Sequence, residues 1–172
     1  PNTNLLEFWQ WCNSDLLSNT ARGIFAEFLV ACDLGIANGV RTEWDAYDLQ
    51  IKNGIKVEVK SSAYLQSWHQ NKLSAISFGI APSLGWDAMT NKFVTGKKRQ
   101  ADIYVFCLLK HKDKKTVDPL DVDQWQFLLL PTTVLNQKVK NQKRISLSRL
   151  QSLKPTKVEF GEIGKTIESL LS

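Results

Sequence analysis

The stretch from residue 48 to residue 62, DLQIKNGIKVEVKSS, restricts the fold more than any other part of the chain. Apolar and polar residues alternate on both sides of Asn53-Gly54, which predicts two antiparallel strands joined by a tight turn. A two-residue loop at this turn would mix apolar and polar side chains on each face. A three-residue loop with Gly54 in the left-handed conformation pairs Leu49 with Val57 and keeps the apolar side chains together. The hydrophobic pattern therefore selects the second register.

The same register places two acidic side chains opposite each other. Asp48 faces Glu58 across the hairpin, and strand periodicity puts Lys60 on the same face as Glu58. Like charges at facing positions destabilise a sheet. We therefore expect a cation to bind between the two carboxylates and offset their repulsion. Carboxylate oxygens without a neighbouring histidine or cysteine favour Mg²⁺ or Mn²⁺ over zinc. The alternative interpretation is an exposed hairpin with an ordinary lysine and glutamate surface.

A third acidic residue, Glu27, lies in an otherwise apolar segment. Every other residue from 23 to 32 is apolar or glycine, which predicts a helix that is buried on all sides. A buried carboxylate is costly unless it is paired, protonated or bound to a metal. Two interpretations of Glu27 stay open, a metal ligand and a salt bridge to a lysine of the sheet.

The remaining pattern predicts one α/β domain, residues 1–172, with a central mixed β-sheet flanked by helices. Residues 81–100 are expected to form a long loop. Strands are expected up to residue 51 and at 55–61, 73–80, 101–109 and 125–130, and a further short element at 145–153. Helices are expected at 3–12, from a cap at Asn19 or Thr20 to Leu34, from Thr132 or Thr133 onward, and at 163–171.

Charge is divided unevenly along the chain. The net charge is +5, but residues 1–50 hold two basic and seven acidic side chains, so the remaining residues carry +10. Basic surface supplies the sequence-independent part of nucleic-acid affinity, so a polyanionic partner is one interpretation. Solvated loops rich in lysine are the other.

Composition excludes several classes of protein. A hydrophobic fraction of 43% and a charged fraction of 23% argue against disorder and fibrous repeats. The longest apolar runs are too short to cross a bilayer, so no membrane association is expected. Three scattered cysteines fit a reducing compartment, which favours a cytoplasmic location.

The charged residues and their spacing resemble the PD-(D/E)XK nuclease superfamily, which has the restriction-endonuclease-like fold. The resemblance covers residues 22–66 and extends more loosely to the strand at 101–109. It is carried by Glu27 on a helix, Asp48 ten residues before Glu58, and Lys60 two residues after Glu58, followed by SSAYLQ. The resemblance implies hydrolysis of phosphodiester bonds, more often in DNA, with Mg²⁺ or Mn²⁺ as cofactor.

The resemblance also implies roles for individual residues. Asp48 and Glu58 match the metal-binding acids, and Lys60 matches the catalytic lysine. Glu27 matches a helix glutamate that some branches use as an extra metal ligand. Gln66 resembles a glutamine that lies near the catalytic site in some branches.

Two departures from the family pattern concern the first acid. Tyr47 stands where the family name has proline. Asp45 competes with Asp48, but strand alternation puts Asp45 on the apolar face, so Asp48 is preferred.

Three basic residues in the expected loop, Lys97, Lys98 and Arg99, are candidate phosphate contacts if the chain is a nuclease. A catalytically silent nucleic-acid-binding module of the same fold is the alternative function. A structural protein, in which Glu27 and Lys60 pair in the core, is a third. Cutting both strands of a duplex at once would need a homodimer, because one chain has a single site of this kind.

Overall fold

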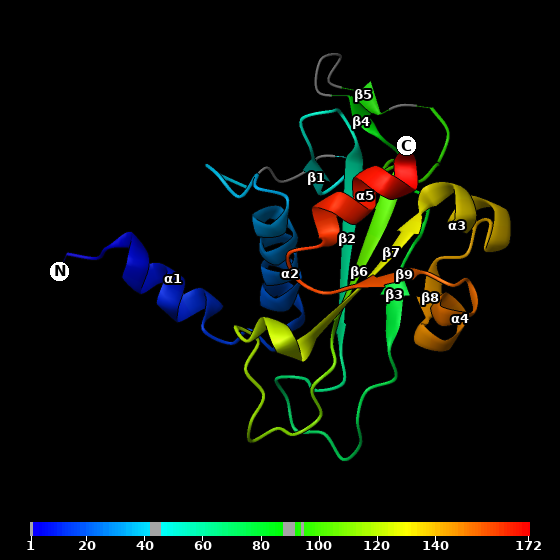
Figure 1. Cartoon of the computed structure of the whole chain (residues 1–172). Helices are drawn as coiled ribbons and strands as arrows, with labels where there is room; N and C mark the ends of the chain where they lie inside the picture. Colours follow the sequence, from blue (N-terminus) through cyan, green and yellow to red (C-terminus); the bar gives the residue numbers. More distant parts are fainter. Residues whose placement is uncertain (1, 42–45, 88–91, 94) are drawn as a thin grey trace.

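A computed structural model describes residues 2–41, 46–87, 92–93 and 95–172. A central sheet has the strand order β1-β2-β6-β7-β9, in which β2 and β6 are parallel and the other neighbours are antiparallel (Figure 1). The strands are β1 (Leu49–Gln50), β2 (Lys56–Ala63), β6 (Ile103–Leu109), β7 (Trp125–Pro131) and β9 (Thr156–Val158). The expected mixed sheet in an α/β fold is therefore confirmed. Asp45 lies outside the described residues.

Helices pack on both faces of this sheet. On one face lie α2 (Asn19–Asp33) and α5 (Ile163–Leu171), and the other face carries α3 (Thr132–Lys138) and α4 (Leu147–Ser152). A short 3₁₀ helix, η1 (Val122–Gln124), precedes β7, and α1 (Leu5–Asn13) projects away from the sheet (Figure 1). No helix in the described part of the chain has the length and apolar character that crossing a membrane requires.

Two apolar cores lie on the two faces of the sheet. Every residue of β6 is buried, because this central strand is covered on both sides. Val105 belongs to the core under α2 and α5, whereas Phe106 belongs to the core under α3 and α4. The alternation along β6 therefore divides one apolar run between two cores.

The predicted hairpin register is confirmed. Leu49 pairs with Val57, and Gly54 has a φ of 86°, the left-handed conformation that the three-residue loop requires. The first strand is shorter than expected, since β1 holds only two residues. Asp48 lies outside this ladder, and its carboxylate instead accepts a hydrogen bond from the Val59 amide.

The prediction that the helix around Glu27 is buried on all sides is wrong. Ile24 and Phe28 on α2 are 37% and 51% exposed, because the sheet covers only one face of this helix. The helix is capped by Ser18, whose hydroxyl accepts a hydrogen bond from the Ala21 amide, and not by Asn19 or Thr20. A side-chain oxygen one residue earlier reaches the free amides of the first turn equally well.

The region around the expected loop contains more pairing than predicted. Of the expected strand at 73–80, only β3 (Ser77–Gly79) forms, and it pairs with β8 (Arg144–Ser146) outside the central sheet. Within residues 81–100, β4 (Trp86–Asp87) pairs with β5 (Lys92–Phe93), and Ser83 forms a bridge with Lys98. The segment after β3 is therefore tied down by its own backbone hydrogen bonds.

Candidate active site

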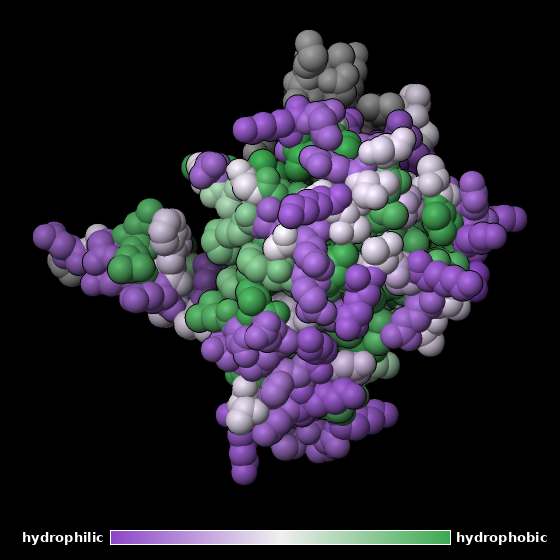
Figure 2. Space-filling view, viewed as in Figure 1, coloured by the Kyte–Doolittle hydropathy of each residue, from purple (hydrophilic) through white to green (hydrophobic). Residues whose placement is uncertain are grey.

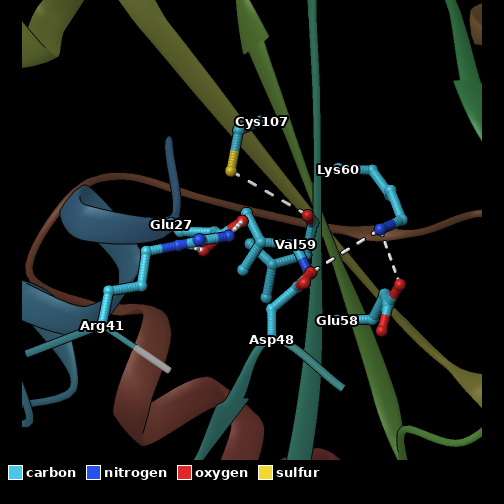
Figure 3. Close-up of polar contacts among 8 residues, drawn as sticks. Glu27, Arg41, Asp48, Glu58, Val59, Lys60 and Cys107 are labelled. Carbon is cyan, nitrogen blue, oxygen red and sulfur yellow. Dashed lines mark hydrogen bonds and ion pairs between the residues drawn. The ribbon is translucent and has the colours of Figure 1, made fainter. Parts of the chain in front are cut away.

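Three of the predicted site residues meet at β2. The Lys60 Nζ atom lies 2.6 Å from a Glu58 carboxylate oxygen and 3.6 Å from the Asp48 Oδ2 atom (Figure 3). Glu58 and Lys60 alternate with buried Val57 and Val59, so both project from the face of β2 opposite α2. The predicted common face of Glu58 and Lys60 is therefore confirmed, and the ammonium of Lys60 bridges two carboxylates.

The orientation of Asp48 is set by the backbone of β2. Its Oδ2 atom accepts a hydrogen bond of 2.7 Å from the Val59 amide. This amide has no ladder partner at that position, since β1 begins one residue after Asp48. The hydrogen bond satisfies the amide and aims the carboxylate toward Lys60.

Glu27 pairs with an arginine. The guanidinium of Arg41 donates two hydrogen bonds to Glu27, at 2.5 Å from Nε and 2.9 Å from Nη2. A lysine of the sheet, the partner considered from the sequence, is therefore not the one found. Arg41 was missed, although it and Arg22 are the only basic residues among the first 50.

The charges of this cluster perturb one another. Burial raises the pKa of Glu58, and the carboxylates of Asp48 and Glu27 raise it further, while Lys60 opposes the shift. Burial lowers the pKa of Lys60, but Glu58, Asp48 and Glu27 outweigh this effect and raise it overall. Lys60 is therefore a firmly held cation that pairs with Glu58 and Asp48 and also lies in the field of Glu27.

The donor chemistry of the cluster suits a hard cation. Asp48 and Glu58 offer only carboxylate oxygens, which Mg²⁺ and Mn²⁺ prefer. Within the described ranges, no three His, Cys, Asp or Glu side chains are grouped closely enough to hold an ion as they stand. The Lys60 ammonium occupies the space between the carboxylates of Asp48 and Glu58, and Arg41 forms an ion pair with Glu27. Binding of an ion between the two acids therefore requires Lys60 to move.

A pocket of about 450 Å³ opens beside the cluster. Glu27, Arg41, Tyr47 and Asp48 line its polar side. Its apolar side is formed by α2 and the segment that follows it, through Ile24, Phe28, Ala31, Ile36 and Val40. Glu27 and Asp48 thus border one cavity that is open to solvent.

Gln66 lies in a separate polar cluster beyond the end of β2. Its side chain accepts a hydrogen bond from Arg22 and donates to the Ala63 carbonyl and the Ser74 hydroxyl. Both Arg22 and Gln66 are buried, at 4% and 6% exposure. The structure therefore places Gln66 with Arg22, and not among the contacts of Lys60.

The three basic candidates for phosphate contact differ in exposure. Lys97 and Lys98 are exposed. Arg99 is 6% exposed and donates hydrogen bonds to the Ile80 carbonyl, the Asn136 side chain and the Gln142 carbonyl. Arg99 therefore anchors the segment that presents the two lysines.

A second basic surface lies in the basic part of the chain after residue 50, and its residues were not singled out from the sequence. A pocket of about 460 Å³ is lined by Tyr64, Lys110, His111 and Lys112, with the Lys112 ammonium 4.7 Å from the centre of the Tyr64 ring. Tyr64 follows β2 directly, roughly 20 Å along the strand direction from Glu58. The pairing of β2 with β6 brings these residues together, so lysine content was the only signal in the sequence.

The comparisons with known proteins agree with a nuclease. No curated protein and no solved structure matched the chain. One protein-family model, described as bacteriophage T4 endonuclease IV, matches residues 4–149. This range contains every residue of the cluster around Lys60 and both basic surfaces. The chain therefore belongs to the bacteriophage T4 endonuclease IV family, a family of nucleases.

Proposed function

We propose that the chain is a Mg²⁺- or Mn²⁺-dependent endonuclease of the PD-(D/E)XK type that hydrolyses phosphodiester bonds in DNA. The observation that carries the proposal is the Lys60 ammonium between Asp48 and Glu58, beside a solvent-open pocket. The family match supports the nuclease class and DNA as the substrate. The parallel β2–β6 pair at the centre of a mixed sheet is in keeping with a restriction-endonuclease-like fold.

In this proposal Asp48 and Glu58 hold the divalent ion. The bound ion supplies Lewis-acid stabilisation of the negative charge that develops on the phosphate. Glu27 lies at the edge of the same pocket and becomes available as a further ligand when Arg41 releases it. Arg41 then donates its paired hydrogen bonds to a phosphate oxygen.

Lys60 acts as a cation in this mechanism. Although burial lowers its pKa, the carboxylates of Glu58, Asp48 and Glu27 raise it overall, so we assign the ammonium the role of a hydrogen-bond donor. With an ion held by Asp48 and Glu58, the Lys60 ammonium would be available to the scissile phosphate. There it orients the attacking water and stabilises the developing negative charge.

The basic surfaces contact the DNA backbone on either side of the site. Lys97 and Lys98 are exposed beside the strand pair β4–β5, and Lys110 and Lys112 are exposed at the far end of β6. Lysines of this kind neutralise phosphates and make binding depend on salt. The excess positive charge after residue 50 is in keeping with this role.

A cleavage assay with matched variants tests the proposal. Wild-type protein is expected to cut DNA with Mg²⁺ or Mn²⁺ and to leave it intact in EDTA. Asp48→Asn and Glu58→Gln are each expected to abolish cleavage, and Glu159→Gln, which alters an exposed glutamate, serves as the control. Thermal unfolding should shift upward with Mg²⁺ in the wild type and not in Asp48→Asn.

The opposite result identifies the alternative function. If single-stranded, duplex and branched DNA all stay intact with both metals, the chain does not act as this nuclease. Salt-sensitive DNA binding that survives Asp48→Asn and Glu58→Gln would then show a catalytically silent binding module.

A further inference from the structure

The helix α1 exposes an apolar stripe that the rest of the chain does not cover. The helix begins with a capping box between Asn4 and Glu7, and none of its residues is buried. Figures 1 and 2 show it projecting from the body with apolar side chains on its surface. Helical spacing places Leu5, Phe8, Trp9 and Cys12 along one stripe, with Leu6 beside it.

Such a helix needs a surface to pack against. Isolated helices of about nine residues are marginal in water, because the cost of forming the first turn is repaid by few hydrogen bonds. The exposed fractions are large, at 61% for Leu6, 53% for Trp9 and 82% for Trp11. The capped helix therefore presents an apolar stripe that no described part of the chain covers.

A second uncovered apolar surface lies on α2. The apolar side of the pocket of about 450 Å³ is formed in part by Ile24 and Phe28, which are exposed, and by Val40, which is 95% exposed. Phe28 and Ile24 lie one turn apart on one face of α2. This surface is a groove alongside a helix, the shape that receives another apolar helix.

The segment that joins α1 to α2 directs α1 away from this groove in its own chain. The Leu17 amide donates to the Asp15 side chain, the Ser18 amide donates to the Asp15 carbonyl, and Arg22 donates to the Leu17 carbonyl. Leu17 also packs against the core under α2. These bonds hold residues 15–18 against the start of α2, and α1 projects from this turn away from the body (Figure 1).

We propose that α1 packs into the α2 groove of a second copy of the chain, which returns its own α1 in the same way. The result is a symmetric dimer in which each contact occurs twice. The two aromatic side chains of the stripe, Phe8 and Trp9, bury roughly 150–250 Å² each when fully covered, and they are 56% and 53% exposed. Together with Leu5 and Leu6, which are 59% and 61% exposed, one arm offers on the order of 400 Å² of exposed surface. Two arms and two grooves then bury roughly 1,600 Å², the size of a stable interface.

The dimer also affects the proposed active site. Glu27 and Asp48 line the same pocket as Ile24 and Phe28. The α1 helix of the partner therefore forms one wall of the cavity beside the acids. This consequence rests on the proposed nuclease function, whereas the dimer itself does not.

Sedimentation of the full chain without metal or DNA tests the dimer. Wild-type protein is expected to be a dimer that dissociates on dilution. The double variant Phe8→Ser, Trp9→Ser and the single variant Phe28→Ser are each expected to be monomeric. Leu120→Ser removes an apolar residue that is 64% exposed elsewhere, so it should leave the dimer intact. A wild-type monomer at all concentrations would overturn the proposal.

Native cysteines report which surfaces meet. Cys12 lies on the α1 stripe, Cys32 lies one turn after Phe28 on α2, and both are exposed, whereas Cys107 is buried. A bis-maleimide is expected to join Cys12 of one copy to Cys32 of the other, and Cys12→Ser should abolish the product. A Cys12–Cys32 link within one chain would show that α1 folds back, and a Cys12–Cys12 link would show that the arms pair with each other. Either result contradicts the proposal.

Discussion

Arg22 and Glu27 lie five residues apart on α2, yet they belong to polar clusters of opposite character. Arg22 is 4% exposed, and its guanidinium donates to the neutral acceptors of Leu17, Asn19 and Gln66. Glu27 lies beside the cluster of Asp48, Glu58 and Lys60, where the side chains of Glu58 and Lys60 are 18% and 30% exposed. One cluster is closed and the other is open to solvent.

The difference lies in how each cluster is satisfied. Neutral acceptors hold Arg22 in one geometry, and burial lowers the pKa of its guanidinium below the ordinary value. In the open cluster, Lys60 forms ion pairs with Asp48 and Glu58, and all three side chains are partly exposed to solvent. An ion or a phosphate can therefore replace one of these partners. A buried, fully enclosed polar cluster stabilises the folded state, whereas a cluster that is open to solvent can bind ligands and take part in catalysis.

The largest effect is expected from Lys60→Ala. Loss of a positioned cation at a reacting phosphate should slow DNA cleavage by about 10²–10³-fold, by analogy with removal of an oxyanion-hole donor. The free energy of unfolding should fall as well, because Asp48 and Glu58, whose side chains are 22% and 18% exposed, lose the cation that they share, so cleavage is compared per folded molecule. Cleavage kinetics and urea unfolding measure both effects, and Lys157→Ala on the exposed Lys157–Glu159 pair is the control. Normal cleavage by Lys60→Ala would show that the cluster around Lys60 is not the catalytic site.

Arg22→Ala is expected to lower the free energy of unfolding without slowing cleavage. The change leaves Gln66, Asn19 and the Leu17 carbonyl without their donor, which should cost about 2–4 kcal/mol of unfolding free energy. Urea unfolding measures this loss, and cleavage per folded molecule should persist. Gln66→Ala sharpens the comparison further, since a slower turnover at unchanged stability would move Gln66 into the catalytic group.

Arg41→Gln is expected to have a smaller effect. It frees Glu27 and removes one positive charge beside the acids, which at about 4 Å in water amounts to about 1 kcal/mol. Mg²⁺ binding measured by calorimetry should therefore tighten about fivefold if Glu27 is a ligand. Unchanged affinity in both Arg41→Gln and Glu27→Gln would exclude Glu27 from the metal site.

The smallest effect is expected on thermal stability at high pH, through the buried side chains of Cys107 and Tyr104. Burial raises the pKa of the Cys107 thiol above its ordinary 9.0 and that of the Tyr104 hydroxyl above 10.0. A group with a raised pKa stabilises the fold below its ordinary value, and this contribution is lost as the pH rises above it. Thermal stability should therefore decline from about pH 9 upward.

Cys107→Ala separates the thiol from the other groups. This variant should begin its decline at higher pH than the wild type, near the ordinary pKa of Tyr104. At neutral pH, maleimide should label Cys12 and Cys32 and spare Cys107. Rapid labelling of Cys107 would mean that this side of the cluster is also open.

Short-range patterns of the sequence were sufficient for the hairpin and the acid–lysine pair. The alternation around Gly54 predicted the pairing of Leu49 with Val57, and strand parity predicted that Glu58 and Lys60 share a face. The apolar run that contains β6 predicted a central buried strand. These predictions succeeded because each depends on residues adjacent in the chain or joined by one tight turn.

Contacts between distant segments could not be predicted in this way. Arg41 contacts Glu27 from a segment that has no apolar periodicity. Arg99 donates to Ile80, which follows β3, and to Asn136 and Gln142, which come about 40 residues later in the sequence. The Tyr64–Lys112 contact depends on the pairing of β2 with β6. No local sequence pattern predicts contacts between segments so far apart in the chain.

The sequence by itself determined the main helices, the strands at β2, β6 and β7, the hairpin register and the presence of three acids with one lysine near β2. Hydrophobic periodicity and turn chemistry act over a few residues, so they can be read from the chain. Tertiary structure alone decided that α2 is half exposed, that Arg41 holds Glu27, and that α1 is left uncovered whereas α5 buries Ile163 and Ile167. The physical reason is that burial depends on which surfaces the folded chain brings together, and two amphipathic helices of similar pattern can have opposite fates.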